Sequence, residues 1–251
     1  MAYRSQEAGC TAILVAISAI APLLGQQELR FDVRHDHWRG SGAAVLVVGE
    51  QMISFQEQNK KGEVRHTGEW RYSDIQELKV SPGTLTVVTY KDRKWRLGAD
   101  QEFKFSLAPG QTFEAVYPLL KARLDQRLVA ALSEQPALTL WEVPVKRLGT
   151  IRGSEGVLRV ASDRIVYSTD QEGQSRTWRY QDIDNISTSG PFELTVTTFE
   201  RSQRHYGSRK AFNFQLKQPL EEAKFDHLWR RLNRSKGLDF LTSIQATEAE
   251  Q

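Results

Sequence analysis

The sequence has very little cysteine, which excludes a disulfide framework. Only one of its 251 residues is a cysteine, Cys10, and it precedes an apolar run near the N-terminus. Small exported domains that cannot build a sufficient core usually rely on several disulfides. The hydrophobic core must therefore stabilise this chain without them. A zinc site or a nucleophile built from cysteine is excluded for the part of the chain that follows Cys10.

Catalytic and phosphate-binding motifs are also missing. Ser41-Gly42 and Gly153-Ser154-Glu155-Gly156 form neither a nucleophile elbow nor a phosphate-binding loop. The acidic residues that recur, Asp74 and Asp182, are typical of tight turns. No nucleophile, base and oxyanion group can be assembled from the sequence. We therefore expect no enzyme, no catalytic residue and no cofactor, and a hydrolase or metal enzyme is the least favoured class.

The sequence also lacks a large excess of charge of either sign. The chain has 34 lysines and arginines against 31 aspartates and glutamates, a formal net charge of +3. A nucleic-acid-binding protein would show a clustered basic face, so we expect no nucleic-acid partner. With 39% hydrophobic and 26% charged residues, the composition is that of a globular protein, and the length suits two domains.

No apolar run reaches the roughly 20 residues that cross a bilayer comfortably. The longest spans residues 10–24 after a polar start with Arg4, which is the layout of a secretory signal peptide. Residues 1–25 are therefore predicted to be a signal, and the protein to be exported to the periplasm or secreted. Ala19-Ile20-Ala21 offers a cleavage pattern, but Pro22 follows it, so an uncleaved segment that tethers the protein to a membrane is the alternative.

The most informative feature that is present is an internal repeat. Five of six positions are identical between two segments, Trp70-Arg71-Tyr72-Ser73-Asp74-Ile75 and Trp178-Arg179-Tyr180-Gln181-Asp182-Ile183. The flanking segments match in the same order, from 45–47 with 157–159 to 103–105 with 212–214. Solenoid repeats have periods of about 20 to 50 residues, whereas each copy here has about a hundred. The repeat predicts two duplicated domains, 33–132 and 139–241, with a linker at 133–137 and a loose tail at 242–251.

Short alternating segments predict mostly strands in each copy. Segments 43–48 and 52–57 form a predicted hairpin, in which Ile53, Phe55 and Glu57 alternate with Met52, Ser54 and Gln56. Later segments alternate in the same way up to 103–107. Apolar residues then recur at steps of three and four from Phe113 to Leu132, which predicts an amphipathic helix that Pro118 kinks or starts. The second copy ends in a predicted helix over 221–234.

This pattern resembles the pleckstrin-homology-like superfold, in particular its bacterial PH and GRAM-like members. The resemblance is carried by the many short strands, the Tyr-x-Asp-Ile corner, the Phe-x-Phe last strand and the C-terminal helix, and it covers both copies. It implies an α+β fold of two tandem PH-like β-barrels, each with about seven antiparallel strands closed by a C-terminal helix. The superfold hosts lipid, peptide and protein binding and is seldom an enzyme, so the fold restricts function only loosely.

One departure from the PH pattern bears on ligands. Phosphoinositide-binding members hold phosphates with basic residues around the first hairpin loop. The matching loops here, Gly49-Glu50-Gln51 and Ala161-Ser162-Asp163-Arg164, are short and carry little positive charge. Phosphoinositide binding at that place is therefore disfavoured.

Repeated aromatic and basic residues are the candidates for a binding surface. Trp70 and Trp178 are more typical of core packing than of exposed binding, and Arg71 and Arg179 are expected to alternate outward. Two basic hairpins occupy equivalent places in the copies and form a candidate surface for an anionic partner: Arg93, Lys94, Arg96, Arg201, Arg204, Arg209 and Lys210. Protection of a strand edge by lysine and arginine explains them as well.

Two histidines raise the question of a metal site. His35 and His37 are two apart and share one face if their segment is a strand. Two ligands do not make a zinc site, and His66 is the only other histidine near them in the sequence. The second copy has Arg147 and Gly149 at the matching positions. We therefore expect no metal.

The duplication, together with the lack of catalytic motifs, favours a binding protein over an enzyme. We expect an exported, non-enzymatic binding or scaffolding module that uses its duplicated PH-like surface to bind a protein partner. The alternative is peripheral binding to an anionic membrane through the basic hairpins.

Overall fold

The computed structural model describes most of the chain after the N-terminal segment. The described residues are 28–37, 40–59, 61–93, 96–149, 153–202, 208–234 and 236, without the side chains of 96–99. The predicted signal at 1–25 and the predicted tail at 242–251 lie outside them. No helix in the described part is both long and apolar enough to span a bilayer.

The first half of the fold contains seven strands and a short helix. The strands are β1 (Leu29–His37), β2 (Gly40–Val48), β3 (Met52–Gln58), β4 (Val64–Arg71), β5 (Ile75–Val80), β6 (Thr84–Arg93) and β7 (Arg96–Leu107). Between β4 and β5 lies the 3₁₀ turn η1 (Tyr72–Asp74), and after β7 come η2 (Glu114–Val116) and the helix α1 (Tyr117–Arg123). A three-residue strand, β8 (Leu128–Ala130), follows and links this half to the next.

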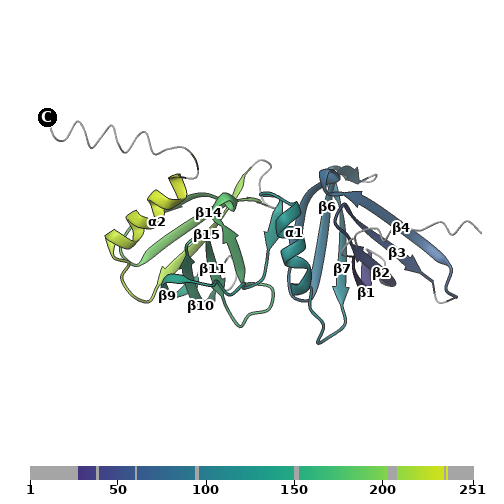
Figure 1. The fold of residues 1–251 in the computed structure, drawn as a ribbon, viewed down its shortest axis with the longest axis horizontal. Helices are drawn as coiled ribbons and strands as arrows, with labels where there is room; N and C mark the ends of the chain where they lie inside the picture. The colour runs from purple at the N-terminus through teal and green to yellow at the C-terminus, as the bar shows by residue number, and fades with distance from the viewer. Residues whose placement is uncertain are drawn as a thin grey trace, which may run out of the picture.

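The second half repeats this series of elements. Its strands are β9 (Thr139–Arg147), β10 (Ser154–Ala161), β11 (Arg164–Ser168), β12 (Arg176–Arg179), β13 (Ile183–Ser187), β14 (Glu193–Arg201) and β15 (Arg209–Leu216). The turn η3 (Tyr180–Asp182) lies between β12 and β13, and the helix α2 (Glu222–Arg234) ends the half. Figure 1 shows the halves side by side, with α1 between them and α2 at the far end of the second half.

The prediction of two closed barrels is wrong, because the described strands form one open sheet. Its fifteen strands run in the order β13-β14-β15-β9-β10-β11-β12-β8-β5-β6-β7-β1-β2-β3-β4. Closing each half would require β4 to pair with β5, and β12 with β13. Neither pair is present among the described strands, and β5 and β12 each pair with β8 instead.

The short strand β8 joins the two halves into a single sheet. It pairs in parallel with β5, where Lys79 lies opposite Val129, and antiparallel with β12, where Thr177 lies opposite Ala130. Ala131 N–H donates to the carbonyl of Val80, 2.7 Å away, and Thr177 Oγ1 donates to Leu132 O at 2.9 Å. The free edges of the described sheet are consequently β4 and β13.

Each half has its own hydrophobic core. In β6, Leu85 and Val87 point inward and are fully buried, while their neighbours in the strand are partly exposed, as alternation along a strand requires. Trp70 is 8% exposed and Trp178 is 2% exposed, which confirms their predicted place in the cores. Trp70 packs with Phe103 in the first core, and Trp178 with Phe212 in the second.

The repeated tyrosine closes an equivalent corner in each half. Tyr72 Oη donates to Gly49 O at 2.7 Å, and Tyr180 Oη donates to Ala161 O at 2.5 Å. Both phenols are thus buried with a hydrogen-bond partner, as buried tyrosines generally require. The hydrogen bond ties the turn that follows the fourth strand of each half to the hairpin turn between its second and third strands.

The predicted long helix after Phe113 is wrong in its second part. Pro118 lies in the first turn of α1, a position where proline is tolerated, but the helix ends at Arg123 and Leu124 is extended. Leu128 lies in β8. Leu124, Leu128 and Leu132 are all buried in the first core, so their spacing satisfies burial without a helix. In contrast, α2 agrees with the predicted 221–234 to within one residue.

A charged segment before residue 43 proves to be a strand. β1 already begins at Leu29, and Arg30, Asp32 and Arg34 face outward from it, while Val33 and His35 are buried. β1 pairs with β2 on one side and with β7 on the other. This pairing fixes the inward direction of His35.

Candidate functional site

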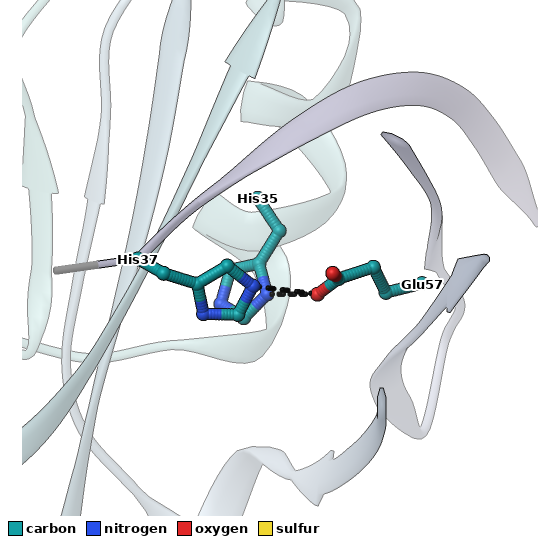
Figure 2. Close-up of side chains that lie close together, drawn as sticks. All are labelled: His35, His37 and Glu57. Atoms are coloured by element: carbon teal, nitrogen blue, oxygen red, sulfur yellow. Dashed lines mark hydrogen bonds and ion pairs between the residues drawn. The ribbon is translucent and has the colours of Figure 1, made fainter. Parts of the chain in front are cut away.

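Two histidines and a glutamate meet at one end of the first core. His35 and His37 come from β1 and Glu57 comes from β3, the two strands that flank β2. Their potential ligand atoms all lie within 4.8 Å of one another, and they are the one such group of histidine, cysteine or carboxylate side chains found within the described residues. Figure 2 shows both imidazole rings directed at the carboxylate of Glu57.

The space for this cluster depends on a glycine in the strand between the ligands. Gly42 on β2 lies opposite His35. A Cβ atom added to Gly42 would be 2.1 Å from Glu57 Oε1 and 2.5 Å from its carboxyl carbon. Only glycine therefore allows the carboxylate to cross over β2 and reach the histidines.

A single carboxylate oxygen holds both rings. His35 Nδ1 lies 3.1 Å and His37 Nε2 lies 2.7 Å from Glu57 Oε2. Glu57 is 1% exposed and His35 is 5% exposed, whereas His37 at the strand end is exposed. The cluster is thus buried on one side and reachable from solvent on the other.

Aromatic rings surround the buried histidine. The ring of His35 is stacked on Phe105 with 5.1 Å between centroids and lies 4.7 Å from Phe55. Burial lowers the pKa of His35 below its ordinary value, although the hydrogen bond to Glu57 acts in the opposite direction. Burial therefore favours the neutral form of His35.

The carboxylate is stabilised as an anion. Burial alone would raise the pKa of Glu57, but the hydrogen bonds from His35 and His37, together with the electrostatic effect of His37 and His66, hold that pKa below its usual range. A neutral imidazole beside an ionised carboxylate is the protonation state that metal binding requires. A third histidine is close, because the ring of His66 on β4 lies 5.4 Å from that of His37.

Glu57 is the member of the cluster that the sequence pattern does not single out as a ligand. It lies on the same strand face as Ile53 and Phe55, which are both buried, and this alternation is the signal that the sequence offers. A glutamate on the buried face of a strand requires a partner. The sequence does not indicate the partner, because the meeting of Glu57 with His35 depends on the register of β1, β2 and β3.

The predicted basic surface is only partly described, and its two hairpins meet. Arg93 donates to Asp100 O at 3.1 Å and pairs with Glu102 at 3.5 Å. Arg201 from the second half forms an ion pair with the side chain of Asp100 and donates to Gln76 Oε1 at 2.7 Å. Asp100 therefore brings one arginine of each hairpin to the same place.

The other described basic residues of this surface are also paired. Arg209 forms an ion pair with Asp184, and Lys210 Nζ lies 3.1 Å from Glu200 Oε2. Lys94 and Arg204 lie outside the described residues, and the side chain of Arg96 is not described. Each of the four described basic side chains of this surface is thus paired with an acidic side chain of the protein itself.

Several buried charges in the second half were not expected from the sequence. Arg179 is 8% exposed and bonds the carboxylate of Asp182 through two nitrogens, 2.9 and 2.8 Å away. It also reaches the first half, where it donates to Asp125 O at 2.7 Å. The expectation that Arg179 points outward is therefore wrong. Arg71, at the same place in the first half, is exposed as expected.

Comparison with known proteins gives only weak likenesses. No protein-family model matches the chain, and no curated protein matches it. Fifty chains of solved structures do match. Among them, the C-terminal domain of an unknown protein from Leishmania infantum is 11% identical with a TM-score of 0.29, covering 38% of this chain and 84% of that chain.

Two further matches are similarly distant. The Spt16D Pob3N heterodimer is 10% identical with a TM-score of 0.32, covering 68% of this chain and 82% of that chain. The hSac2 domain from the human phosphoinositide phosphatase Sac2 is 8% identical with a TM-score of 0.31, covering 46% of this chain and 84% of that chain. We draw no function from these likenesses.

Proposed function

We propose that this protein is a non-enzymatic binding module that captures an extended segment of a protein partner along the free edge of β4. The proposal rests on a difference between the two halves of the protein, in the edges of β4 and β12. β12 is the fourth strand of the second half, as β4 is the fourth strand of the first. β12 pairs with β8 along the edge that corresponds to the free edge of β4. Of these two equivalent edges, the edge of β12 is thus already paired with an extended segment, β8, whereas the edge of β4 is free in the described sheet.

The two edges differ in burial. All four residues of β12 are buried, whereas six of the eight residues of β4 are exposed, including Val64 at 53%. An exposed strand edge carries backbone N–H and C=O groups that another strand can pair with. Partners that add a strand in this way gain affinity from main-chain hydrogen bonds and specificity from alternate side chains.

The face beside β4 offers room for such side chains. A hollow of about 570 Å³ lies on the outer face of β1–β4, with Ser54, Gln56, Thr67 and Glu69 among its lining residues. The lining is mixed in polarity and includes Arg30 as well as Glu69. A partner segment with alternating polar and small apolar residues would fit this face.

Site-specific photocrosslinking in the native host tests the proposal. A photoreactive residue in place of Thr67, exposed on β4, should crosslink to one protein through a segment that is extended. The same residue in place of the exposed Gln171, which lies in a loop of the second half, is the matched control. Hydrogen exchange of the β4 amides should slow when a peptide of the captured segment is added. Equal crosslinking at both positions, or no slowing at β4, would contradict the proposal, as would substrate turnover by the purified protein.

The membrane alternative has less support, because the described basic residues are compensated by nearby carboxylates. If it holds, Arg93→Glu and Arg209→Glu together should abolish binding to vesicles that contain an anionic phospholipid. Unchanged vesicle binding would count against it.

Fold relationship and location are proposals that rest on the sequence. The strand order of each half, three strands beside four with a helix at the end, supports kinship with the PH-like superfold without requiring closed barrels. Export rests on residues 1–25 alone.

A further inference from the structure

We propose that His35, His37 and Glu57 bind a divalent transition-metal ion, zinc in particular, through two imidazole nitrogens and one carboxylate oxygen. This inference is independent of the partner-binding proposal, because it concerns a different face of β1 and β3. The sequence alone offers only His35 and His37 as ligands, and the fold adds Glu57 as the third.

The distances in the cluster already suit a shared ion. Zinc binds imidazole nitrogen and carboxylate oxygen at about 2.0–2.2 Å, so two ligands of a tetrahedral ion lie about 3.3 Å apart. The two nitrogens are 3.1 and 2.7 Å from Glu57 Oε2. Small side-chain rotations therefore convert the hydrogen-bonded cluster into a ligand set.

The chemistry of the donors selects the class of metal. Calcium and magnesium prefer oxygen ligands, whereas two histidines and a carboxylate are a known set for zinc and for other transition metals. An imidazole that binds a metal ion is neutral and carries its one proton on the nitrogen that faces away from the ion. Binding therefore requires the tautomers that leave a lone pair on Nδ1 of His35 and on Nε2 of His37, the atoms that face Glu57.

The surroundings favour a bound cation. Glu57 is a buried carboxylate whose described hydrogen-bond partners are the two histidines. In the second half, Arg147 lies opposite Phe214 as His35 lies opposite Phe105. Its guanidinium group lies 5.8 Å from the ring centre of Phe212 and 5.9 Å from that of Tyr167. A permanent positive charge thus occupies this place in the second half, and a metal ion would supply one in the first.

The site is accessible and preformed. His37 lies at the end of β1 and is exposed, so an ion can enter from solvent without opening the core. Gly42 provides the space in which the carboxylate sits. The protein supplies three ligands, and solvent can supply the fourth, as in zinc sites with an open position.

Titration of the metal-stripped, untagged full chain with zinc chloride tests the site. Calorimetry should show one equivalent bound, and cobalt(II) should give the strong visible absorption of a tetrahedral complex. His37→Ala and Glu57→Gln should each weaken zinc binding by about 100-fold or more, because each removes a direct ligand and the loss of an outer-shell partner alone costs about 10- to 100-fold. The exposed His227 on α2 offers the matched control, and His227→Ala should leave the affinity unchanged.

A ligand-neutral variant separates metal binding from simple loss of a residue. Gly42→Ala retains all three ligands but displaces the carboxylate of Glu57, so it should weaken zinc binding while circular dichroism shows the sheet retained. Zinc should also raise the unfolding temperature of the wild type and not that of Glu57→Gln, because a ligand stabilises only the state that binds it. Failure of the wild type to bind zinc at micromolar concentration, or equal affinity in wild type and Glu57→Gln, would overturn the assignment.

Discussion

At the scale of single residues, a few buried polar groups matter more for the stability of the fold than the many surface ion pairs. Tyr72 and Tyr180 each have their phenol buried against a turn carbonyl. Surface pairs such as Lys217 with Glu155 join exposed side chains and contribute little. The tyrosines therefore offer a measurable signature of the folded state.

The two tyrosines predict a loss of stability at alkaline pH. Burial raises the pKa of Tyr72 and of Tyr180 from 10 to about 12. Between these values the unfolded chain loses the phenolic protons and the folded chain keeps them, so stability is complete below pH 10 and falls as pH rises towards 12. The loss is roughly 2–3 kcal/mol for each tyrosine.

Urea unfolding at a series of alkaline pH values measures this loss. The double variant Tyr72→Phe and Tyr180→Phe should be less stable at neutral pH, by about 0.5–1.5 kcal/mol for each lost hydrogen bond. Its stability should depend less steeply on pH across the same range. Parallel pH profiles of variant and wild type would show that other groups cause the alkaline transition.

At the scale of elements, an arginine from the second half holds the end of a helix in the first. Arg179 donates to Lys121 O and Leu124 O, both at 3.3 Å, at the C-terminal end of α1. The last carbonyls of a helix have no partner within it. Arg179 supplies these partners and also keeps Asp182 paired inside the protein.

Removing this guanidinium group should be strongly destabilising. Arg179→Met leaves the buried Asp182 with the backbone N–H of residue 179 but without its positively charged partner, and breaking a buried ion pair in this way costs about 3–5 kcal/mol. Arg71 holds the same place in the first half but is exposed, so Arg71→Met should change stability by less than about 0.5 kcal/mol. Chemical denaturation of both variants measures the difference. Similar losses in the two would refute the special role of Arg179.

At the scale of the whole molecule, β8 makes two seven-stranded sheets into one. It has three residues and pairs with one strand of each half. Arg179 and Arg201 add contacts across the same junction. The unfolding of the two halves should therefore be coupled.

A proline next to β8 should weaken this coupling. Ala131→Pro removes the hydrogen bond from Ala131 N–H to Val80 O and leaves a buried carbonyl without its donor, at a cost of about 1–3 kcal/mol. Calorimetry should then resolve two transitions instead of one. Ala137→Pro, at an exposed linker position, is the control and should retain the wild-type profile. A single unchanged transition in Ala131→Pro would show that β8 does not couple the halves.

Local patterns in the sequence determined much of what lies inside each half. Alternation put Ile53 and Phe55 on one face of a predicted strand, and both are buried; the repeated Trp-Arg-Tyr segment identified two tryptophans that are also buried. The helical spacing at 221–234 was sufficient for α2. These features depend on residues close together in the chain, because the period of a strand or helix fixes which side chains share a face.

Only the tertiary structure decided how those elements pair. The spacing of Leu124, Leu128 and Leu132 is compatible with a helix, yet pairing with β5 and β12 draws residues 128–130 into a strand and keeps the sheet open. The cluster of Glu57 with His35 and His37 likewise depends on register across three strands and on the missing side chain of Gly42. Such contacts join residues distant in the sequence, so their energies act on strand pairing and leave no periodic signal in the chain.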